Sequence, residues 1–134
     1  MAKLKKPKLK SIKYLRNKAD RLLQELGRKV YTNCEICGKP MDCMHHFYGK
    51  GSSSPLRYCW ENLIPICTSC HVKIELRKSH ELTARIVLGR GEDWLNELSR
   101  KQHVYLKTDR FYYEGIIKKL SLAFNKEMIK PYKV

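Results

Sequence analysis

Apolar residues recur at three- and four-residue spacing in the segment between Ser11 and Gly27. They are Ile12, Leu15, Ala19, Leu22, Leu23 and Leu26. This spacing predicts an amphipathic helix, for which Ser11 is a typical N-cap and Gly27 a typical end. The opposite face is basic and carries Lys13, Arg16, Lys18 and Arg21. We therefore expect one stripe of this helix to be buried while another remains free to meet a polyanion.

Residues 31–80 lose the helical period, and turn-forming residues and cysteines take over. Glycine, proline, asparagine and serine interrupt the apolar positions throughout residues 33–65. This pattern predicts short strands joined by loops, including a hairpin whose long connection runs between His46 and Asn62. A helix is expected to begin between Thr68 and His71, because the pattern then continues without a breaker.

Three further helices are predicted after residue 78. Residues 79–88 and 92–100 have helical patterns on either side of Gly89-Arg90-Gly91, and a last helix is expected from Thr108-Asp109. Its buried face would carry Tyr112, Tyr113, Ile116, Ile117, Leu120 and Phe124. The sequence thus predicts a small α+β protein with a basic tail (1–10), a basic amphipathic helix (11–30), a cysteine-rich core (31–80) and a C-terminal helical region (81–134).

The composition adds a strong positive charge to this outline. The 134 residues carry 28 basic and 13 acidic side chains, which give a formal net charge of +15, and 43% are hydrophobic. That hydrophobic content supports a folded core rather than a wholly disordered basic chain. Residues 1–30 alone hold 11 basic and 2 acidic side chains. An anionic partner is expected, and nucleic acid is preferred over a membrane surface or a merely solubilising flank.

Export and membrane insertion are both disfavoured by the sequence. Apolar stretches such as residues 86–88 are far too short to cross a bilayer, and no apolar segment follows the N-terminal lysines. We therefore expect an intracellular, cytoplasmic protein.

Four of the six cysteines form two pairs with the spacing of zinc knuckles. Cys34-x-x-Cys37 and Cys67-x-x-Cys70 are separated by 29 residues, and Gly38 directly follows the first pair. Two such pairs can close a tetrahedral shell of thiolates around a structural zinc ion, which would stabilise a segment with few large apolar residues. Disulfides and a redox-active dithiol are the competing uses. Cys43 and Cys59 fall outside the spacing and are expected to be buried thiols.

Histidines lie beside these cysteines in a characteristic order. Adjacent His45-His46 would point to opposite faces of a strand and could hold different roles, Asn62 precedes an apolar run, and His71 follows Cys70 directly. The stretches Asp42-Cys-Met-His-His-Phe47 and Glu61-Asn-Leu-Ile-Pro-Ile-Cys67-Thr-Ser-Cys-His71 together resemble the HNH nucleases of the ββα-metal superfamily, over residues 34–75. More loosely, the size, the basic flank and the Asp42-x-x-His motif with Phe47 are similar to the phage NinG (Rap) recombination nucleases, which act on branched DNA.

This resemblance implies a fold and a set of roles. It implies a small ββα-metal core in which a hairpin and a helix grip one catalytic metal ion. By the same resemblance His46 is the general base, His45 and His71 are metal ligands, and Asn62 orients the base by hydrogen bonds. A neutral imidazole can take a proton near pH 7, and a divalent metal can stabilise the leaving oxygen of a phosphodiester. Imidazole ligands favour manganese, nickel, cobalt or zinc over magnesium.

Five other polar residues admit more than one interpretation. Glu75, one helical turn after the last of these histidines, is either a further metal ligand or a solvent-facing helix residue. Asp42 is either an acceptor for a ligating histidine or a turn residue. Arg57, in the long connection, is a candidate phosphate clamp because of its fork geometry, although surface arginines are common. His80 and His103 lie outside the motif and are expected to be ordinary surface or packing residues.

We therefore expect a metal-dependent HNH endonuclease that hydrolyses DNA, with structural Zn²⁺ and one catalytic divalent metal such as Mn²⁺, Mg²⁺, Ni²⁺ or Zn²⁺. Its partner would be duplex or branched DNA of phage or host, in the host-cell cytoplasm if the protein is phage-encoded. The alternative is a non-catalytic zinc module that binds DNA or RNA, and only the histidines and Asn62 discriminate between the two. The sequence leaves DNA architecture, sequence preference and oligomeric state open.

Overall fold

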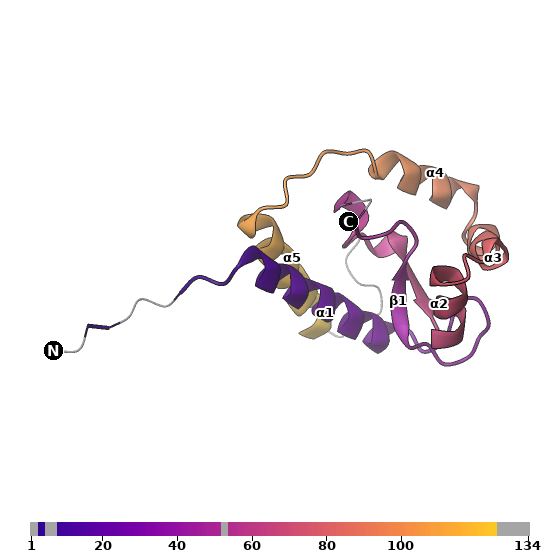
Figure 1. Ribbon diagram of the computed structural model, residues 1–134, viewed down its shortest axis with the longest axis horizontal. Coiled ribbons are helices and arrows are strands. Elements are labelled where there is room, and N and C mark those ends of the chain that lie inside the picture. Colours follow the sequence, from indigo (N-terminus) through magenta and orange to yellow (C-terminus); the bar gives the residue numbers. More distant parts are fainter. Residues whose placement is uncertain (1–2, 5–7, 52–53, 126–134) are drawn as a thin grey trace.

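The structure is a computed structural model that describes residues 3–4, 8–51 and 54–125. Parts of the predicted basic tail (1–2 and 5–7) lie outside the described residues. The elements are α1 (Ile12–Val30), β1 (Cys43–His46), the 3₁₀ turns η1 (Ser54–Leu56) and η2 (Trp60–Asn62), β2 (Leu63–Ile66), α2 (Thr68–Glu75), α3 (His80–Arg90), α4 (Glu92–Lys101) and α5 (Arg110–Asn125) (Figure 1). A helix lies at each place where the sequence predicts one. Within the described ranges, no helix combines the length and the apolar character that a bilayer crossing requires.

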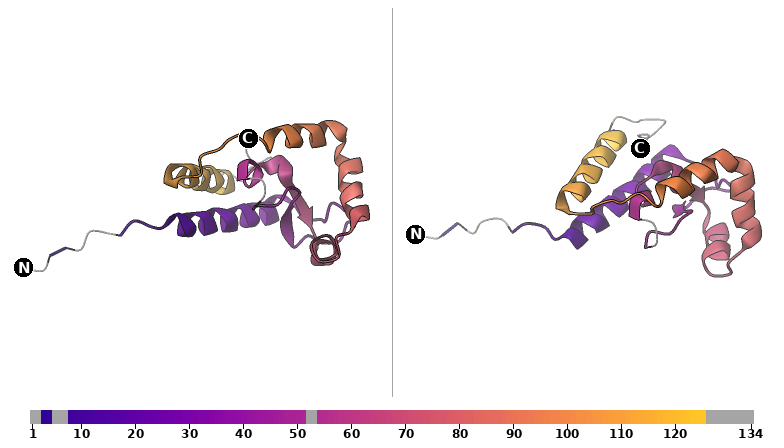
Figure 2. Two further views of the ribbon diagram at one scale, coloured as in Figure 1. Left: turned by 45° about the horizontal axis from the view of Figure 1, so that its top comes forward. Right: turned by 90° about the horizontal axis from the view of Figure 1, so that it is seen from above.

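Helices α1 and α5 pack against each other and supply most of the largest hydrophobic cluster (Figures 1 and 2). The buried members that these two helices contribute are Leu15, Ala19, Leu23, Leu26, Tyr113, Leu120 and Ala123. The partly buried residues of α5 that pack on this cluster include Tyr112, Ile116, Ile117 and Phe124. The apolar stripes predicted for both helices are therefore confirmed, except that Ile12 at the start of α1 is exposed. The predicted N-cap is confirmed as well, since Ser11 Oγ accepts a hydrogen bond from the Tyr14 amide at 3.1 Å.

Helix α1 does not end at Gly27, and this prediction is wrong. The helix continues to Val30, and Gly27 is buried against Met44 of β1. A Cβ atom at Gly27 would stand 2.2 Å from Met44 Cγ. The glycine therefore permits a close approach of helix to strand, and it does not terminate the helix.

The two strands form an antiparallel sheet, and α2 follows directly after β2 in the sequence. β1 and β2 pair in the register Cys43↔Ile66 to His46↔Leu63, and the long connection between them contains η1 and η2. All four residues of β2 are buried, and α2 begins two residues after the strand ends. The predicted hairpin and helix start are confirmed. The protein is thus a mixed helical fold around a small two-stranded antiparallel sheet.

One side chain fixes α1 to the outer edge of β1. Gln24 Oε1 accepts a hydrogen bond from the Met44 amide at 2.8 Å, and Gln24 Nε2 donates to the Met44 carbonyl at 3.0 Å. One helical turn later, Arg28 Nε donates to the carbonyl oxygen of Asp42 at 3.0 Å. Helix α1 therefore lies along β1 in a fixed register.

Helices α3 and α4 continue from α2 around the other side of the hairpin (Figure 2). Gly91, whose φ is 96°, separates them in a backbone conformation that favours glycine. Arg90 links this region to the hairpin, because its guanidinium pairs with Glu35 at 2.7 Å and donates to the carbonyl oxygens of Glu61 and Leu63.

Candidate functional site

The four knuckle cysteines come together in one cluster. Cys34, Cys37, Cys67 and Cys70 offer sulfur atoms that all lie within 4.8 Å of one another, and Cys37 Sγ is 3.6 Å from Cys67 Sγ. Four thiolates around zinc, with bonds of about 2.3 Å, would stand about 3.8 Å apart. Every cysteine of the chain is described, and all six are free thiols, so disulfides are not formed. The cluster could hold a zinc ion.

Local backbone geometry builds this cluster. Gly38 has φ 77° directly after the first pair, and the Gly38 amide bonds to the Cys34 carbonyl at 3.0 Å. Cys67 is the N-cap of α2 and accepts from the Cys70 amide. Burial, together with the neighbouring thiols, raises the pKa of Cys70 to about 12. Such a group of thiols loses its protons readily only beside a cation, which fits a metal site.

A second cluster combines side chains from β1 and α2. His45, His71 and Glu75 each offer a ligand atom, and these atoms also lie within 4.8 Å of one another. Glu75 Oε1 is 3.2 Å from His45 Nδ1 and 3.6 Å from His71 Nε2. His45 is buried, which is the main cause that lowers its pKa, whereas the Glu75 side chain is 51% exposed. Two neutral imidazoles and a carboxylate suit a divalent transition metal with open positions.

This second cluster opens into a cavity of about 470 Å³. The residues that line the cavity are Gln24, Cys43, Met44, His45, His46, Gly49, Lys50, His71 and Glu75. Gln24 and Lys50 were not singled out from the sequence. Lys50 had a usable signal, because it lies between two glycines shortly after the histidine pair. Nothing in the sequence marks Gln24 as a cavity residue, because its position depends on how α1 packs against β1.

His46 lines the same cavity but stands outside the ligand cluster. Its Nε2 lies 2.9 Å from the carbonyl oxygen of Arg57. Burial is the main cause that lowers the pKa of His46 to about 4, so the ring is neutral at pH 7. The adjacent histidines thus occupy different environments, as expected for neighbours on a strand.

Asn62 is fully buried, but it does not bond to His46 as predicted. Within the described part of the chain, its amide accepts from the Tyr48 amide at 2.8 Å and donates to the carbonyl oxygens of Tyr48 and Leu56. The residue therefore ties the two ends of the long connection together. Its bond to the Leu56 carbonyl lies next to Arg57, the residue whose carbonyl oxygen contacts His46.

Arg57 is held in an ion pair, and its role as a phosphate clamp stays a prediction. Arg57 Nε and Nη2 both donate to the carboxylate of Asp20 on α1, the first at 3.0 Å to Oδ1. Tyr58 also donates to Asp20 Oδ1, at 2.9 Å. Burial would raise the pKa of Asp20, but the bonds from Arg57 and Tyr58 outweigh it and lower the pKa. The sequence could not reveal this pairing because Asp20 looks like any acid on a basic helix.

Asp42 belongs to the first turn of α2. Its Oδ2 accepts from the backbone amide of Thr68 at 2.7 Å and from Thr68 Oγ1 at 2.8 Å. These hydrogen bonds lower the pKa of Asp42, and the bond from the Thr68 backbone amide has the larger effect. Of the two interpretations left open, neither a bond to a histidine nor a plain turn is found. The carboxylate satisfies a free amide at a helix start.

The remaining candidates divide between structural and surface positions. Cys59 is buried, as predicted, and its thiol donates a hydrogen bond to Glu61. Cys43 departs from that prediction, because it is only partly buried and its Sγ lies 3.6 Å from His71 Nδ1. His80 and His103 are exposed and lie outside both clusters.

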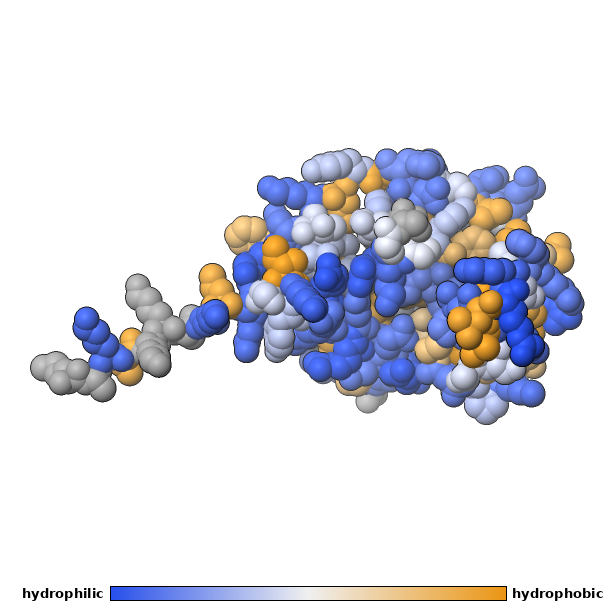
Figure 3. Space-filling model, viewed as in Figure 1, coloured by the Kyte–Doolittle hydropathy of each residue, from blue (hydrophilic) through white to orange (hydrophobic). Residues whose placement is uncertain are grey.

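The basic residues of α1 lie at the surface. Lys13 and Arg21 are exposed, while Arg16 and Lys18 are partly buried. The face that carries α1 in Figure 1 is mostly hydrophilic in the space-filling view (Figure 3). Nucleic-acid binding by these four residues stays a prediction.

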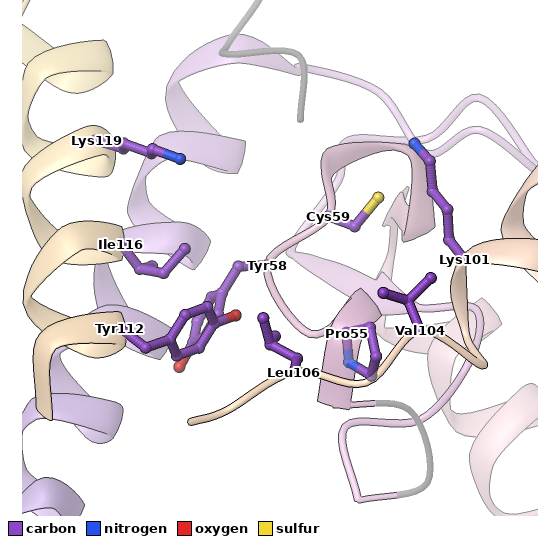
Figure 4. A pocket seen from close by; sticks show the side chains of 9 residues that line it. All are labelled: Pro55, Tyr58, Cys59, Lys101, Val104, Leu106, Tyr112, Ile116 and Lys119. Atoms are coloured by element: carbon purple, nitrogen blue, oxygen red, sulfur yellow. The ribbon is translucent and has the colours of Figure 1, made fainter. Parts of the chain in front are cut away.

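A second cavity, of about 390 Å³, has a different chemistry. It lies between α5 and residues 101–106 and is walled mainly by apolar and tyrosine side chains, with Lys101 and Lys119 at its edges (Figure 4). Cys59 is the single thiol, carboxylate or imidazole among its lining residues. A metal-dependent reaction therefore fits the cavity of the histidines better than this one.

Comparisons with known proteins give two partial similarities. No protein-family profile matches the chain, and no solved structure matches it. The mitochondrial DNA mismatch repair protein mutS homolog of Sarcophyton glaucum is 40% identical over 52 residues, which are 34% of this chain and 5% of that protein. The E3 ubiquitin ligase TRIM40 of Pan troglodytes is 34% identical over 74 residues, 51% of this chain and 31% of that protein. The chain spans less than a third of the length of either relative.

Proposed function

We propose that the protein is a metal-dependent endonuclease of the HNH type that hydrolyses DNA phosphodiester bonds. The observation that carries this proposal is the convergence of His45, His71 and Glu75 on one cavity, with His46 beside them. A nucleic-acid-binding module has no need of this set, whereas hydrolysis needs a metal site and a base together.

His46 would supply the base through its Nδ1 atom. A carbonyl oxygen only accepts hydrogen bonds, so the contact with Arg57 holds the ring proton on Nε2 and leaves a lone pair on Nδ1. The ring is neutral at pH 7, and a bound phosphate anion would raise its pKa from about 4 toward the range in which a base is effective. A water molecule in the cavity can then lose its proton to Nδ1 as it attacks phosphorus.

The metal would be held by His45, His71 and Glu75. When bound, a divalent ion stabilises charge on the phosphate and on the departing oxygen. The two histidine ligands each have a support of their own: His45 lies in the paired strand β1, and His71 contacts Cys43 through Nδ1. Such supports fix the ring angles of metal ligands. The cysteine cluster would contribute stability and no chemistry, because a shell of four thiolates leaves no open position.

DNA as the substrate is supported by charge and by one relative. A net charge of +15 favours a polyanion, and the matched relative from Sarcophyton glaucum is by name a DNA mismatch repair protein. The rival proposal, a zinc module that binds nucleic acid without cutting it, accounts for the charge and the cysteines equally well. It leaves the paired histidines and Glu75 without a role.

A plasmid-nicking assay tests the proposal. Supercoiled DNA with added Mn²⁺ should be nicked by the wild-type protein, and a chelator should stop the reaction. His46→Ala should slow nicking by about 10²- to 10⁴-fold, as expected for loss of a general base, while zinc content and DNA binding persist. His80→Ala, an exposed histidine outside both clusters, should nick like wild type. DNA binding without nicking, across several divalent metals, would instead establish the rival.

A further inference from the structure

One cationic side chain lines the cavity of the histidines, and a second lies close to it. Lys50 lines the cavity, and its charge acts on both His46 and Asp20. Arg28 does not line the cavity but lies near it, because it bonds to the carbonyl of Asp42 and its charge acts on the thiol of Cys43, a lining residue. Both cations are exposed.

The docking of α1 on β1 sets the positions of these cations. Asp20, Gln24 and Arg28 are one helical turn apart and share one face of α1. Gln24 contacts Met44, Arg28 contacts Asp42, and Asp20 holds Arg57, whose carbonyl meets His46. Helix and strand therefore run alongside the cavity in opposite directions, with Arg28 near the start of β1 and Lys50 near its end.

The alternative cation in this region is already neutralised. Arg57 is 19% exposed in its side chain and forms a two-bonded ion pair with Asp20. Breaking that pair to bind a phosphate would leave the partly buried Asp20 carboxylate without its partner, which is costly. Within the described residues Lys50 has no hydrogen bond or ion pair, and Arg28 commits only one nitrogen to a carbonyl. These two can form charge-assisted bonds to an anion at small cost.

We propose that Lys50 and Arg28 bind the two backbone phosphates on either side of the phosphate that is cut. This inference rests on the proposed endonuclease function and specifies how its site holds the substrate. A DNA strand would run along the cavity that α1, β1 and α2 line together, with the scissile phosphate at His45, His71 and Glu75. Contacts of this kind fix position on the strand and carry no base information, so cutting should depend little on sequence.

Two substrates of different length test the inference. Plasmid DNA has flanking phosphates, whereas bis-p-nitrophenyl phosphate is a diester with none. Lys50→Gln and Arg28→Gln should each lower kcat/KM on DNA about tenfold, mainly through KM, and should each reduce the slope of log affinity against log salt concentration by about one. Hydrolysis of bis-p-nitrophenyl phosphate should stay within twofold of wild type in both variants.

Matched variants remove the same charges elsewhere. The Lys73→Gln variant removes an exposed charge on α2, and the Arg85→Gln variant removes an exposed charge on α3. Both should cleave DNA within twofold of wild type. Lys50→Arg should recover most of the lost activity, zinc content should be unchanged in every variant, and the melting temperature should fall slightly only in Arg28→Gln, which loses the bond to the Asp42 carbonyl.

The outcomes separate this inference from the proposed function. If wild-type protein hydrolyses neither substrate with any divalent metal, the proposed function fails. If wild type cleaves both but Lys50→Gln and Arg28→Gln match their controls on DNA, the function stands and this inference is overturned. Equal losses on DNA and on bis-p-nitrophenyl phosphate would also overturn it, because they would place the two residues in the chemical step or in folding.

Discussion

The cysteine cluster and the histidine cluster lie next to each other in one small core, and they differ in nearly every physical property. The first presents four sulfur atoms, three of them from buried residues, enclosed by a tight turn and by the N-terminus of α2. The second presents two imidazoles and a half-exposed carboxylate at the wall of a cavity. One helix serves both, since Cys70 and His71 are neighbours in α2.

This contrast teaches how one short helix can divide two tasks. A closed shell of buried thiolates has no room for a further ligand, so it can only add to stability. An open set with a carboxylate facing solvent leaves positions for water and substrate. We therefore expect changes at the cysteines to act on folding, and changes at the histidines and Glu75 to act on binding and rate.

The largest effect is expected from Cys67→Ser. This variant loses one zinc ligand while its serine can still cap α2, so bound zinc should fall well below one ion per chain and the protein should no longer unfold cooperatively. Structural zinc contributes on the order of 10 kcal/mol to the folding of small modules. Zinc analysis and thermal melts followed by circular dichroism measure both quantities.

Cys59→Ser is the matched control for that prediction. Cys59 is as buried as Cys67 but lies outside the cluster. Its substitution should leave zinc content intact and cost about 1–2 kcal/mol. If the two variants lost equal stability and kept equal zinc, the cysteine cluster would be ordinary packing rather than a metal site.

A smaller, more selective effect is expected from Glu75→Gln. The substitution keeps the shape but removes the charge, so affinity for Mn²⁺ or Ni²⁺ at the second cluster should fall about 10- to 100-fold. Zinc in the cysteine cluster should be unaffected. Calorimetric titration of zinc-loaded protein measures this, with Glu81→Gln on α3 as the control. Loss of both metals together would show that the clusters are not independent.

Two glycine substitutions should have opposite signs. Gly27→Ala places a Cβ against Met44 and should destabilise the protein by about 1–3 kcal/mol and slow DNA cleavage, because α1 must move away from β1. Gly115→Ala in α5 meets no atom within 4 Å, so it should stabilise by up to about 1 kcal/mol through helix propensity. Chemical denaturation measures both, and stabilisation by Gly27→Ala would refute the close contact.

The smallest effect is expected from Asp42→Asn. Asparagine keeps one acceptor for Thr68 but loses the charge at the N-terminus of α2, so the melting temperature should fall slightly. The DNA cleavage rate should not change, because the Asp42 carboxylate bonds to Thr68 and to no member of the histidine cluster. A clear loss of rate at unchanged stability would assign Asp42 to the histidine cluster instead.

The sequence was sufficient for those features that depend on local spacing. The two CxxC pairs, the helix that begins at Thr68 and the buried stripes of α1 and α5 follow from periodicity and turn chemistry, which neighbouring residues determine. Glu75 lies close to His45 and His71 because it follows His71 by one turn of α2, and His45 lies in the regular strand β1. Its role as a metal ligand stays a prediction, since the side chain is both close to the two histidines and half exposed.

Features that depend on contacts between distant segments could not be predicted. Asp20 and Arg57 are 37 residues apart, and nothing local distinguishes either from a solvated charge. The same holds for Asn62, which closes the long connection rather than touching His46. Gly27 was misinterpreted because a glycine that ends a helix and one that admits a neighbour look identical in sequence.

The side chain of Gln24 has a consequence beyond holding α1 in place. A two-stranded sheet offers an outer edge on which another chain can add a strand, and such edges promote aggregation. At Met44 the Gln24 amide already occupies both backbone groups of that edge, as the peptide of a third strand would. With Gln24, helix α1 thus blocks the outer edge of β1 at Met44 against intermolecular β-pairing.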